Sequence, residues 1–321
     1  MKAIFQDRYG TADVLDLREV ARPEVGAGEV LVRVRAAGVN ALDWHVMRGS
    51  PIVARPMMGW RRPRPVVRGV DVAGVVEAVG ADVRAFAKGD EVFGWCAGSF
   101  AEYASAGAEH FVHKPADLTF EQAAAVPLAA TTALQGLRDA GHLEPGQRVL
   151  IVGASGGVGT FAVQLAKASG AEVTGVCSTR NVDLVRSLGA DRVIDYTQED
   201  PTRNGGPYDL ILELAGTSSA TSYLRVLTPD GTLVLSSGAG GHWVGPMARM
   251  AKAKLSARFV RQTMTWLATS MNHADLVVLT GYLGSGAIHP VMDRSFGLPD
   301  APAAIRYVEI GHTRGKTVIT V

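Results

Sequence analysis

Short runs of alternating apolar and polar residues dominate the first third of the chain. Residues 29–39, EVLVRVRAAGV, alternate Val and Leu with Glu and Arg, a pattern typical of a strand with one buried face. Similar short runs follow at 72–80, 90–95 and 99–106, separated by turns that contain glycine. Recurring short strands of this kind predict a small barrel or sandwich over the first part of the chain.

The pattern changes after residue 118. We expect Thr119 to cap an alanine-rich helix that Pro127 interrupts. Further along, strand-like runs alternate with helix-like segments, which is typical of βαβ units in a doubly wound parallel sheet. The strand-like runs are 149–153, 172–178, 192–196, 208–216 and 231–238, and the clearest helical segments are 157–170 and 181–190. Residues 288–321 return to short strands, which we expect to rejoin the first domain.

The sequence therefore predicts an α/β protein with two domains. A β-rich domain of residues 1–125 and 282–321 encloses a Rossmann domain of residues 126–281. The length of 321 residues allows two domains, and a composition of 47% hydrophobic and 20% charged residues allows a sizeable buried core.

Charge and cysteine content narrow the functional classes. The formal net charge of +1 argues against an extended nucleic-acid surface. Cys96 and Cys177 are too few for a disulfide framework, which favours a reduced, cytoplasmic setting. The N-terminus has no hydrophobic run of the signal-peptide kind, and no apolar stretch approaches 18 residues, so we expect no integral membrane contact.

The stretch GASGGVG, residues 153–159, stands between a predicted strand and a predicted helix. In this variant of the dinucleotide fingerprint, Gly156 lets the backbone approach a pyrophosphate and Gly159 lets helix and strand pack closely. No Lys-Ser or Lys-Thr pair follows, which excludes a mononucleotide P-loop. The sequence thus predicts dinucleotide binding rather than a purely structural turn. The cofactor-binding residues expected here are Ala154, Ser155, Gly156, Gly157 and Val158.

The end of the second strand of this domain indicates which dinucleotide to expect. NAD sites place a carboxylate there, whereas this chain has Ser178, Thr179 and Arg180, with no carboxylate until Asp183. Two hydroxyls and an arginine suit a 2′-phosphate, because one charge-assisted hydrogen bond contributes about 1.5–3 kcal/mol. Tyr196, ending the third strand, offers another hydroxyl. NADPH is therefore favoured; the alternative is that Arg180 stacks on adenine and serves either cofactor.

Several segments together resemble the medium-chain dehydrogenase/reductase superfamily, and within it the zinc-free quinone oxidoreductase branch. They are EVLVRVRAAGVNALDWHVMRG, RGVDVAGVVEAVGADVRAFAKGDEVFG, GSFAEY, AAAVPLAATTALQGL and GASGGVG, in this order along the chain. The resemblance runs nearly from end to end. It implies a GroES-like catalytic domain formed by both chain ends, a Rossmann domain between them, and an active site in the cleft between the two domains.

The resemblance also bears on metal binding. Zinc-dependent members carry Cys where this chain has Asn40, and Gly-His-Glu where it reads Gly69, Val70 and Asp71. Catalytic zinc needs about three converging Cys, His or carboxylate ligands. With two expected ligands missing, no metal is expected, and His45, as a lone candidate ligand, is expected to be a satisfied polar residue. Without a Lewis acid, hydride addition to a quinone or conjugated enone needs less help than alcohol oxidation, since charge delocalises onto a distal oxygen.

The resemblance implies roles for further residues. Asn40 and Asp43 line the nicotinamide end of the site, where Asn40 bonds cofactor or substrate unless it only stabilises a turn. The titratable ring of His45 is a candidate proton relay, but water is the favoured alternative, because the family has no universal acid at this place. Thr131 or Thr132 contacts the cofactor, unless each makes only a local helix bond. The strand ends expected along the cofactor are Leu214, Ala215, Gly216, Ser236, Ser237 and Gly238.

Other charged features are expected to lie outside the site. Lys316 is expected to be solvated. The basic segment 58–69 is expected to be an exposed loop, with a substrate entrance for anions as the alternative. The basic segment 243–267 is expected to be a surface stretch or an edge used in dimerisation, with membrane contact as the alternative.

Together these features predict a zinc-independent enzyme that transfers hydride from NADPH to a quinone or an α,β-unsaturated carbonyl. Two alternatives stay open: a trans-acting enoyl reductase for acyl thioesters, and a non-catalytic NADPH-binding sensor. The family expectation is a homodimer that acts on a small-molecule electrophile.

Overall fold

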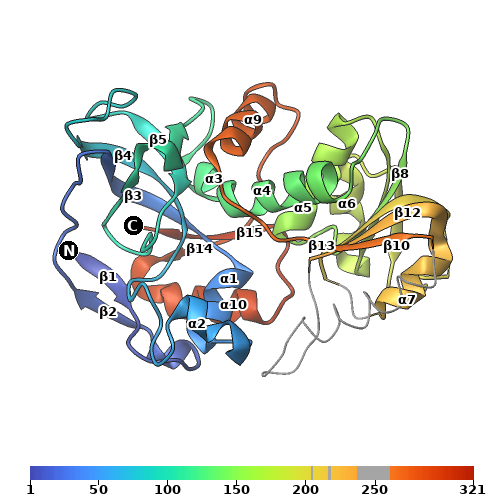
Figure 1. Cartoon of the computed structure of the whole chain (residues 1–321), viewed down its shortest axis with the longest axis horizontal. Helices are drawn as coiled ribbons and strands as arrows, with labels where there is room; N and C mark the ends of the chain where they lie inside the picture. Colours follow the sequence, from blue (N-terminus) through green and yellow to red (C-terminus); the bar gives the residue numbers. More distant parts are fainter. Residues whose placement is uncertain (204, 216–217, 237–260) are drawn as a thin grey trace. The chain divides into compact units, whose positions relative to one another are not determined.

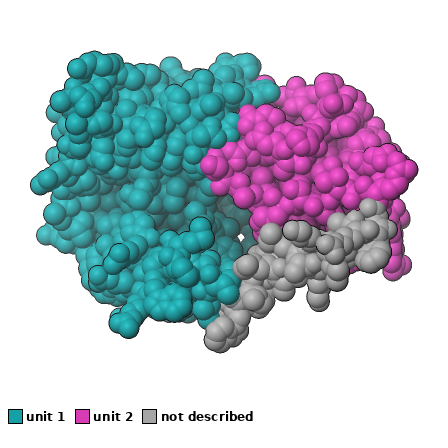
Figure 2. Space-filling view, viewed as in Figure 1, with its two compact units in different colours: residues 1–131, 271–286, 290–321 teal, residues 132–270, 287–289 magenta. Residues whose placement is uncertain are grey.

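The computed structural model describes residues 1–203, 205–215, 218–236 and 261–321, and its chain divides into two compact units (Figure 1, Figure 2). Unit 1 comprises residues 1–131, 271–286 and 290–321, and unit 2 comprises residues 132–270 and 287–289. Both ends of the chain belong to unit 1. This unit also includes residues 126–131 and 271–281, which the sequence analysis assigned to the Rossmann domain.

Unit 1 is built on β-strands. Strands β1 and β2 form an antiparallel pair, and a larger sheet has the order β14-β15-β3-β4-β5-β7, with β6 also paired to β3. The strands are β1 (Lys2–Phe5), β2 (Asp16–Glu19), β3 (Glu29–Val39), β4 (Asp71–Val79), β5 (Glu91–Trp95), β6 (Tyr103–Gly107), β7 (Phe111–His113), β14 (Met292–Gly297) and β15 (Lys316–Thr320). The long strand predicted at 29–39 is confirmed, and so is the return of the C-terminal strands to this domain. Figure 1 shows β15, near the C-terminus, beside β3 from the N-terminal part.

Helices around this sheet are α1 (Ala41–Arg48), α2 (Arg55–Met58), α3 (Phe120–Ala124), α9 (His273–Gly284) and α10 (Ala301–Glu309), and α4 (Pro127–Gln135) continues from unit 1 into unit 2. The predicted cap is confirmed, because Thr119 Oγ1 accepts a hydrogen bond from the Gln122 amide. Pro127 separates α3 from α4, as expected. The expectation of strands alone after residue 288 is wrong, since α10 lies between β14 and β15. Its buried Ala301, Ala304 and Ile305 follow helical spacing.

Unit 2 contains a six-stranded parallel sheet of order β10-β9-β8-β11-β12-β13. Its strands are β8 (Arg148–Val152), β9 (Glu172–Cys177), β10 (Arg192–Asp195), β11 (Tyr208–Glu213), β12 (Leu227–Leu235) and β13 (Thr263–Trp266), and its helices include α5 (Gly157–Ala168), α6 (Val182–Ser187) and α7 (Ala220–Tyr223). The predicted doubly wound sheet is confirmed. The strand order reverses between β8 and β11, and ligands of such sheets bind beyond the carboxyl ends of the strands at that point.

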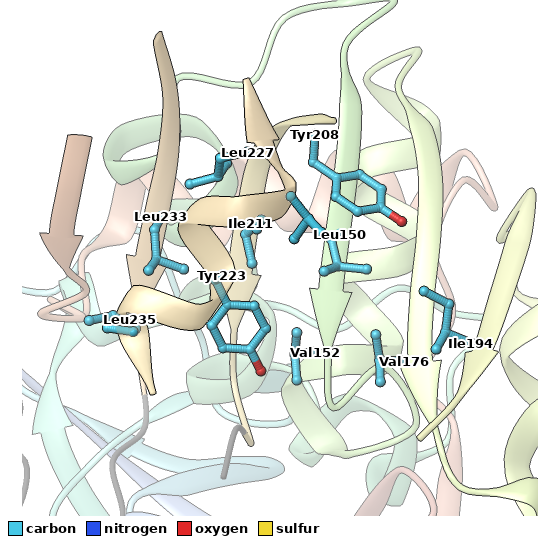
Figure 3. Packing of buried hydrophobic residues seen from close by; sticks show 12 residues of the cluster. Leu150, Val152, Val176, Ile194, Tyr208, Ile211, Tyr223, Leu227, Leu233 and Leu235 are labelled. Atoms are coloured by element: carbon cyan, nitrogen blue, oxygen red, sulfur yellow. The ribbon is translucent and has the colours of Figure 1, made fainter. Parts of the chain in front are cut away.

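Apolar packing fixes these strand ends. Figure 3 shows Leu150, Ile211 and Leu233, from the neighbouring strands β8, β11 and β12, together with Tyr223 of α7 in one buried cluster. Burying a side chain of this size contributes about 1.5–3 kcal/mol. The cluster therefore holds the carboxyl ends of β8 and β11 in a defined position.

Candidate cofactor and substrate sites

The glycine turn of unit 2 connects β8 to α5. Gly153 has φ +89°, a left-handed conformation that glycine adopts without strain. A Cβ at Gly159 would lie 2.1 Å from the Gly153 carbonyl oxygen, so any side chain would force the helix away from the strand. Among the described residues, no side chain caps α5 at Gly156, and the first-turn amides remain donors for an anion. The turn thus has the two features that a pyrophosphate site needs, close backbone approach and unused amides.

Polar side chains connect this turn to the end of β9. The Asn181 Nδ2 group donates to Ser155 Oγ at 2.9 Å and lies 3.4 Å from Ser178 Oγ. Asn181 is buried, and its Oδ1 has no partner within the described part of the chain. The structure therefore brings Ser155 and Ser178, both predicted site residues, to one position. Asn181 was missed in the sequence because it stands four residues after the strand, at the start of α6.

A carboxylate lies closer to this position than the sequence suggested. Thr179 Oγ1 donates to Asp195 Oδ2 at 2.6 Å, and the Thr197 hydroxyl and amide also bond this carboxylate. These hydrogen bonds, that of Thr179 foremost, lower the pKa of Asp195, so the group is ionised at neutral pH. The sequence has no carboxylate between Cys177 and Asp183, but the fold supplies one from another strand. The parallel pairing of β10 with β9 sets Asp195 opposite Cys177, at the end of β9.

The other predicted cofactor residues of unit 2 lie at or near strand ends. The Tyr196 amide bonds the Cys177 carbonyl after β10, and the Tyr196 side chain is exposed. Leu214 follows β11 and its amide bonds Val152 at the end of β8. Ala215 lies against the glycine turn, since a Cβ on Gly153 would meet its Cβ at 2.8 Å. Ser236 follows β12 and is half-buried, while Gly216, Ser237 and Gly238 lie outside the described residues.

The two threonines of α4 differ in their surroundings. Thr131 is buried, and its hydroxyl has no partner among the residues that the structure describes. The Thr132 hydroxyl accepts a hydrogen bond from Thr269 at 3.1 Å. Thr131 is therefore the one of the two whose hydroxyl keeps its full bonding capacity within the described residues.

In unit 1, three polar side chains form a buried cluster. The Asn40 Nδ2 group donates to Asp71 Oδ2 at 2.9 Å, and the Lys316 ammonium donates to Asn40 Oδ1 at 2.5 Å and to the Val39 carbonyl at 3.2 Å. Lys316 Nζ lies 3.7 Å from Asp71 Oδ2. The expectation that Lys316 is solvated is wrong, since it is only 3% exposed. The antiparallel register pairs Thr317 of β15 with Val39 of β3. Lys316, which precedes Thr317, is therefore set beside Asn40, which follows Val39.

The surroundings of Asp71 complete this cluster. Its second oxygen accepts the Leu128 amide at 3.0 Å, in the first turn of α4. Gly38 makes room for it, because a Cβ there would lie 2.4 Å from the Ala124 carbonyl oxygen and 3.0 Å from Asp71 Oδ2. Burial raises the pKa of Asp71, while the Lys316 ammonium and the Asn40 amide oppose that shift. Burial likewise lowers the pKa of Lys316, against the attraction of Asp71.

Asp43 adjoins this cluster through the backbone. Its Oδ2 accepts the Asn40 amide at 2.8 Å, at the start of α1, while its Oδ1 is buried without a partner in the described structure. Burial raises the pKa of Asp43 to about 6, although the nearby Arg68 charge opposes the shift. Asn40 and Asp43 form a capping box at the start of α1, and the Asn40 side chain also bonds Asp71 and Lys316, so its role is not confined to the local turn.

His45 is not part of this group. On a helix with 100° per residue, Asp43 and His45 point in nearly opposite directions. The His45 ring stacks on Trp44 at 3.5 Å between centroids, and its Nδ1 bonds the Ser50 carbonyl at 3.2 Å. Burial lowers the pKa of His45, which favours the neutral ring. The structure therefore gives no support to a proton relay through His45.

The expectation that the basic segment 58–69 is an exposed loop is only partly confirmed. Arg61, Arg62 and Arg64 are exposed, as expected for a loop, but Arg68 is buried and its charge acts on Asp43. Of the second basic segment, residues 243–260 lie outside the described residues, and Arg261 pairs with Asp230 at 2.9 Å. No helix in the described ranges is long and apolar enough to span a bilayer.

The donor set in unit 1 does not suit zinc. Where zinc-dependent members carry the Cys and the His, this chain has Asn40 and Val70, and the Asn40 side chain bonds Asp71 and the Lys316 ammonium. A positive charge already lies beside the Asn40 side chain. Across the described residues, no group of three His, Cys, Asp or Glu side chains is placed to hold a metal ion. Cys96 is buried, and burial raises the pKa of its thiol to about 12.

Two segments match known families. Residues 26–116 match the alcohol dehydrogenase GroES-like domain, and residues 188–319 match zinc-binding dehydrogenase. The whole chain is 34% identical to the Mus musculus protein named NAD(P)H oxidoreductase RTN4IP1, mitochondrial, and covers 89% of it. It is 33% identical to the NADPH-dependent alkenal/one oxidoreductase, chloroplastic, of Arabidopsis thaliana, with 99% of this chain and 79% of the relative covered.

A solved structure shows the same relationship. The quinone oxidoreductase from Coxiella burnetii has a TM-score of 0.88 and 31% identity, with 100% of this chain and 99% of that chain covered. The similarity thus includes both units. On this evidence the chain belongs to the medium-chain dehydrogenase/reductase superfamily.

Proposed function

We propose that this oxidoreductase transfers hydride from NADPH to a quinone or an α,β-unsaturated carbonyl without a metal ion. Relatives named for quinone and alkenal/one reduction, at 31% and 33% identity over nearly the whole chain, support the reaction class. Unit 2 supplies the dinucleotide site and unit 1 supplies the polar groups for the substrate.

The observation that carries the proposal is the bonding of Asn40. Its carboxamide stands where zinc-dependent members carry a zinc ligand, and Asp71 and Lys316 hold it. An amide that donates a hydrogen bond stabilises an oxyanion far from the carbon that accepts hydride, which is what a quinone or enone requires. An amide N–H stabilises a developing negative charge less than a metal ion does, so direct reduction of a simple aldehyde is disfavoured.

Asn40 and Asp43 have different roles in the proposed reaction. When bound, reduced nicotinamide supplies the hydride. Asn40 donates its remaining N–H to the substrate oxygen on which negative charge develops. Asp43 accepts the Asn40 backbone amide and so fixes the start of α1, which carries that side chain.

The choice of NADPH rests on the end of β9. Ser178 lies there half-buried, and Arg180 lies there exposed. The Arabidopsis thaliana relative is named as NADPH-dependent. The ionised Asp195 opposes a 2′-phosphate by like charge and uses the Thr179 hydroxyl. The preference for NADPH over NADH therefore depends mainly on Arg180.

The test is the oxidation of NADPH or NADH by chelator-treated protein whose metal content has been measured. The acceptors are an ortho-quinone, a para-quinone, an alkenal and a simple aldehyde. We expect turnover of a quinone or the alkenal with NADPH and little with the aldehyde. Activity that returns only on adding zinc would overturn the proposal. Tight NADPH binding without any turnover would instead favour a carrier-bound acyl thioester or a sensor. The homodimer and the cytoplasmic location stay predictions.

A further inference from the structure

The orientation of the Asn40 carboxamide is set from both sides. Its oxygen faces the Lys316 ammonium at 2.5 Å, and its nitrogen faces Asp71 Oδ2 at 2.9 Å. The flipped amide would set its N–H groups against an ammonium and its oxygen against a carboxylate, two repulsive contacts in place of two hydrogen bonds. Only one orientation is therefore compatible with the two charges.

This orientation leaves a donor unused. An Asn nitrogen has two N–H groups, and within the described residues one of them is used, by Asp71. Asn40 is 8% exposed, Lys316 is 3% exposed and Asp71 is fully buried, so Asn40 is the most exposed member of the cluster. Its second N–H is thus the donor that the cluster leaves for a ligand.

We infer that Lys316 and Asp71 are positioning residues that hold the Asn40 amide as a hydrogen-bond donor for the substrate oxygen. This inference rests on the proposed function. An internal ammonium group, supplied by the last strand, then lies beside the residue that stands in place of the zinc-binding Cys. Lys316 acts through Asn40 and does not itself touch the substrate.

The cost of the cluster argues for such a role. Burying a lysine and an aspartate removes both from water, and replacing a buried ion pair by apolar residues often leaves stability unchanged or improves it. Stability alone therefore does not require this pair. In surroundings of low dielectric constant, an ammonium on the amide oxygen also polarises the amide and strengthens its N–H as a donor.

Unit 1 contains a matched control. The Lys114 side chain is 4% exposed and also binds carbonyl oxygens, those of Pro115 and Leu118, and the carboxylate of Glu91. It has the burial of Lys316 without contact to Asn40. Lys114→Met measures what the loss of a buried ammonium does to folding alone.

The experiment is a double-mutant cycle in the full-length protein. The variants are Lys316→Met, Asn40→Ala and the pair together, with Lys316→Arg as the conservative variant and Lys114→Met as the control. We measure kcat with saturating NADPH and the best acceptor from the panel, the Kd of NADPH by fluorescence, and Tm. Saturating cofactor separates substrate chemistry from cofactor binding.

We expect Lys316→Met to lower kcat about 10- to 100-fold, the range known for residues that orient metal ligands through hydrogen bonds, which act in the same indirect way. In the Asn40→Ala background the same change should lower kcat by no more than about twofold, because its route of action is already gone. Lys316→Arg should recover part of the loss, and Lys114→Met should lower Tm while sparing kcat.

Three results would overturn the inference. They are an equal effect of Lys316→Met with and without Asn40, normal kcat in Lys316→Met, and normal kcat in Asn40→Ala while the wild type turns over. No turnover by the wild type would instead be a failure of the proposed function. If Lys316→Met does not fold, Asp71→Asn replaces it in the same cycle, and the same three outcomes apply.

Discussion

The turn between β8 and α5 of unit 2 is made of consecutive residues, and its backbone amides are the groups that we propose bind the cofactor. The buried cluster of unit 1 is made of side chains from three places, with Asn40 after β3, Asp71 at the start of β4 and Lys316 at the start of β15. In the turn, the absence of side chains at Gly156 and Gly159 is what matters. In the cluster, charge and hydrogen-bond direction matter, and one glycine, Gly38, only makes room.

The difference explains what each region contributes. Backbone amides at a helix N-terminus bind any phosphate of suitable shape, so in our proposal the turn provides affinity for a common cofactor. A side chain held by two buried charges has one orientation and one remaining donor, so in the same proposal the cluster orients the substrate for one reaction. Substitutions should therefore separate binding from turnover.

The largest effect is expected at Gly159. Replacement by Ala sets a Cβ 2.1 Å from the Gly153 carbonyl oxygen, so strand and helix must move apart. We expect Gly159→Ala to lose about 3 kcal/mol of stability, the upper end of the range for overpacking, and to lose NADPH binding. Urea unfolding and fluorescence titration measure the two effects.

Gly281→Ala in α9 is the matched control, since a Cβ there meets nothing within 4 Å. This change should leave cofactor binding intact and stabilise by up to about 1 kcal/mol. If both alanine variants behave alike, the close approach at Gly159 has no importance for the turn.

The next effect concerns the pH dependence of unit 1. Burial raises the pKa of Asp43 to about 6, above its value of about 3.9 in an unfolded chain. The folded state thus binds the proton more tightly, and stability falls as pH rises from about 4 to about 6. Relative to Asp43→Asn, the wild type should lose up to about 3 kcal/mol over this range and change little above it.

Urea unfolding of both proteins from about pH 4 to pH 8 measures this difference. Asp183→Asn is the control, because that side chain is 95% exposed and lies on α6 of unit 2. A constant difference between wild type and Asp43→Asn across the range would contradict the burial of an ionisable Asp43.

The smallest effect is expected at the cofactor phosphate. Arg180→Ala should weaken NADPH binding by about 10- to 150-fold and leave NADH binding nearly unchanged, since only NADPH carries the 2′-phosphate. Asp195→Asn should strengthen NADPH binding, because it removes a like charge beside Thr179. Fluorescence titration of each variant and of the wild type with NADPH and with NADH measures these affinities.

Arg186→Ala serves as the charge-matched control, since Arg186 is exposed and pairs with Asp183 on α6. It should change neither affinity. Equal losses of NADPH and NADH affinity in Arg180→Ala would show that this arginine stacks on adenine and does not select the cofactor.

The contrast between contacts within one segment and contacts between distant segments also explains which features the sequence predicts. The glycine turn, the alternating strands and the Thr119 cap depend on neighbouring residues, and each was predicted. The approach of Asp195 to Thr179 depends on strand pairing, and the bond of Lys316 to Asn40 depends on two strands from opposite ends of the chain. No local pattern indicates that a Lys at the start of a strand is buried, so this residue was expected in solvent.

The missed helix α10 has a different cause. Its sequence carries helix signals, with Pro299 and Pro302 near its start and apolar residues at helical spacing, but it is short and lies between two strands, whose pattern dominates this part of the chain. His45 was grouped with Asp43 because the two are close in sequence, although a helix sends them in different directions.

The most direct test of the central claim follows the position of the transferred hydrogen. NADPH deuterated at the transferable position of its nicotinamide is incubated with an enone and the metal-depleted protein, and the product is analysed by NMR. The account predicts a saturated ketone with deuterium at the carbon β to the carbonyl, because the Asn40 amide holds charge on the distal oxygen. Deuterium at the carbinol carbon of an allylic alcohol would contradict it, because that product arises from direct carbonyl reduction.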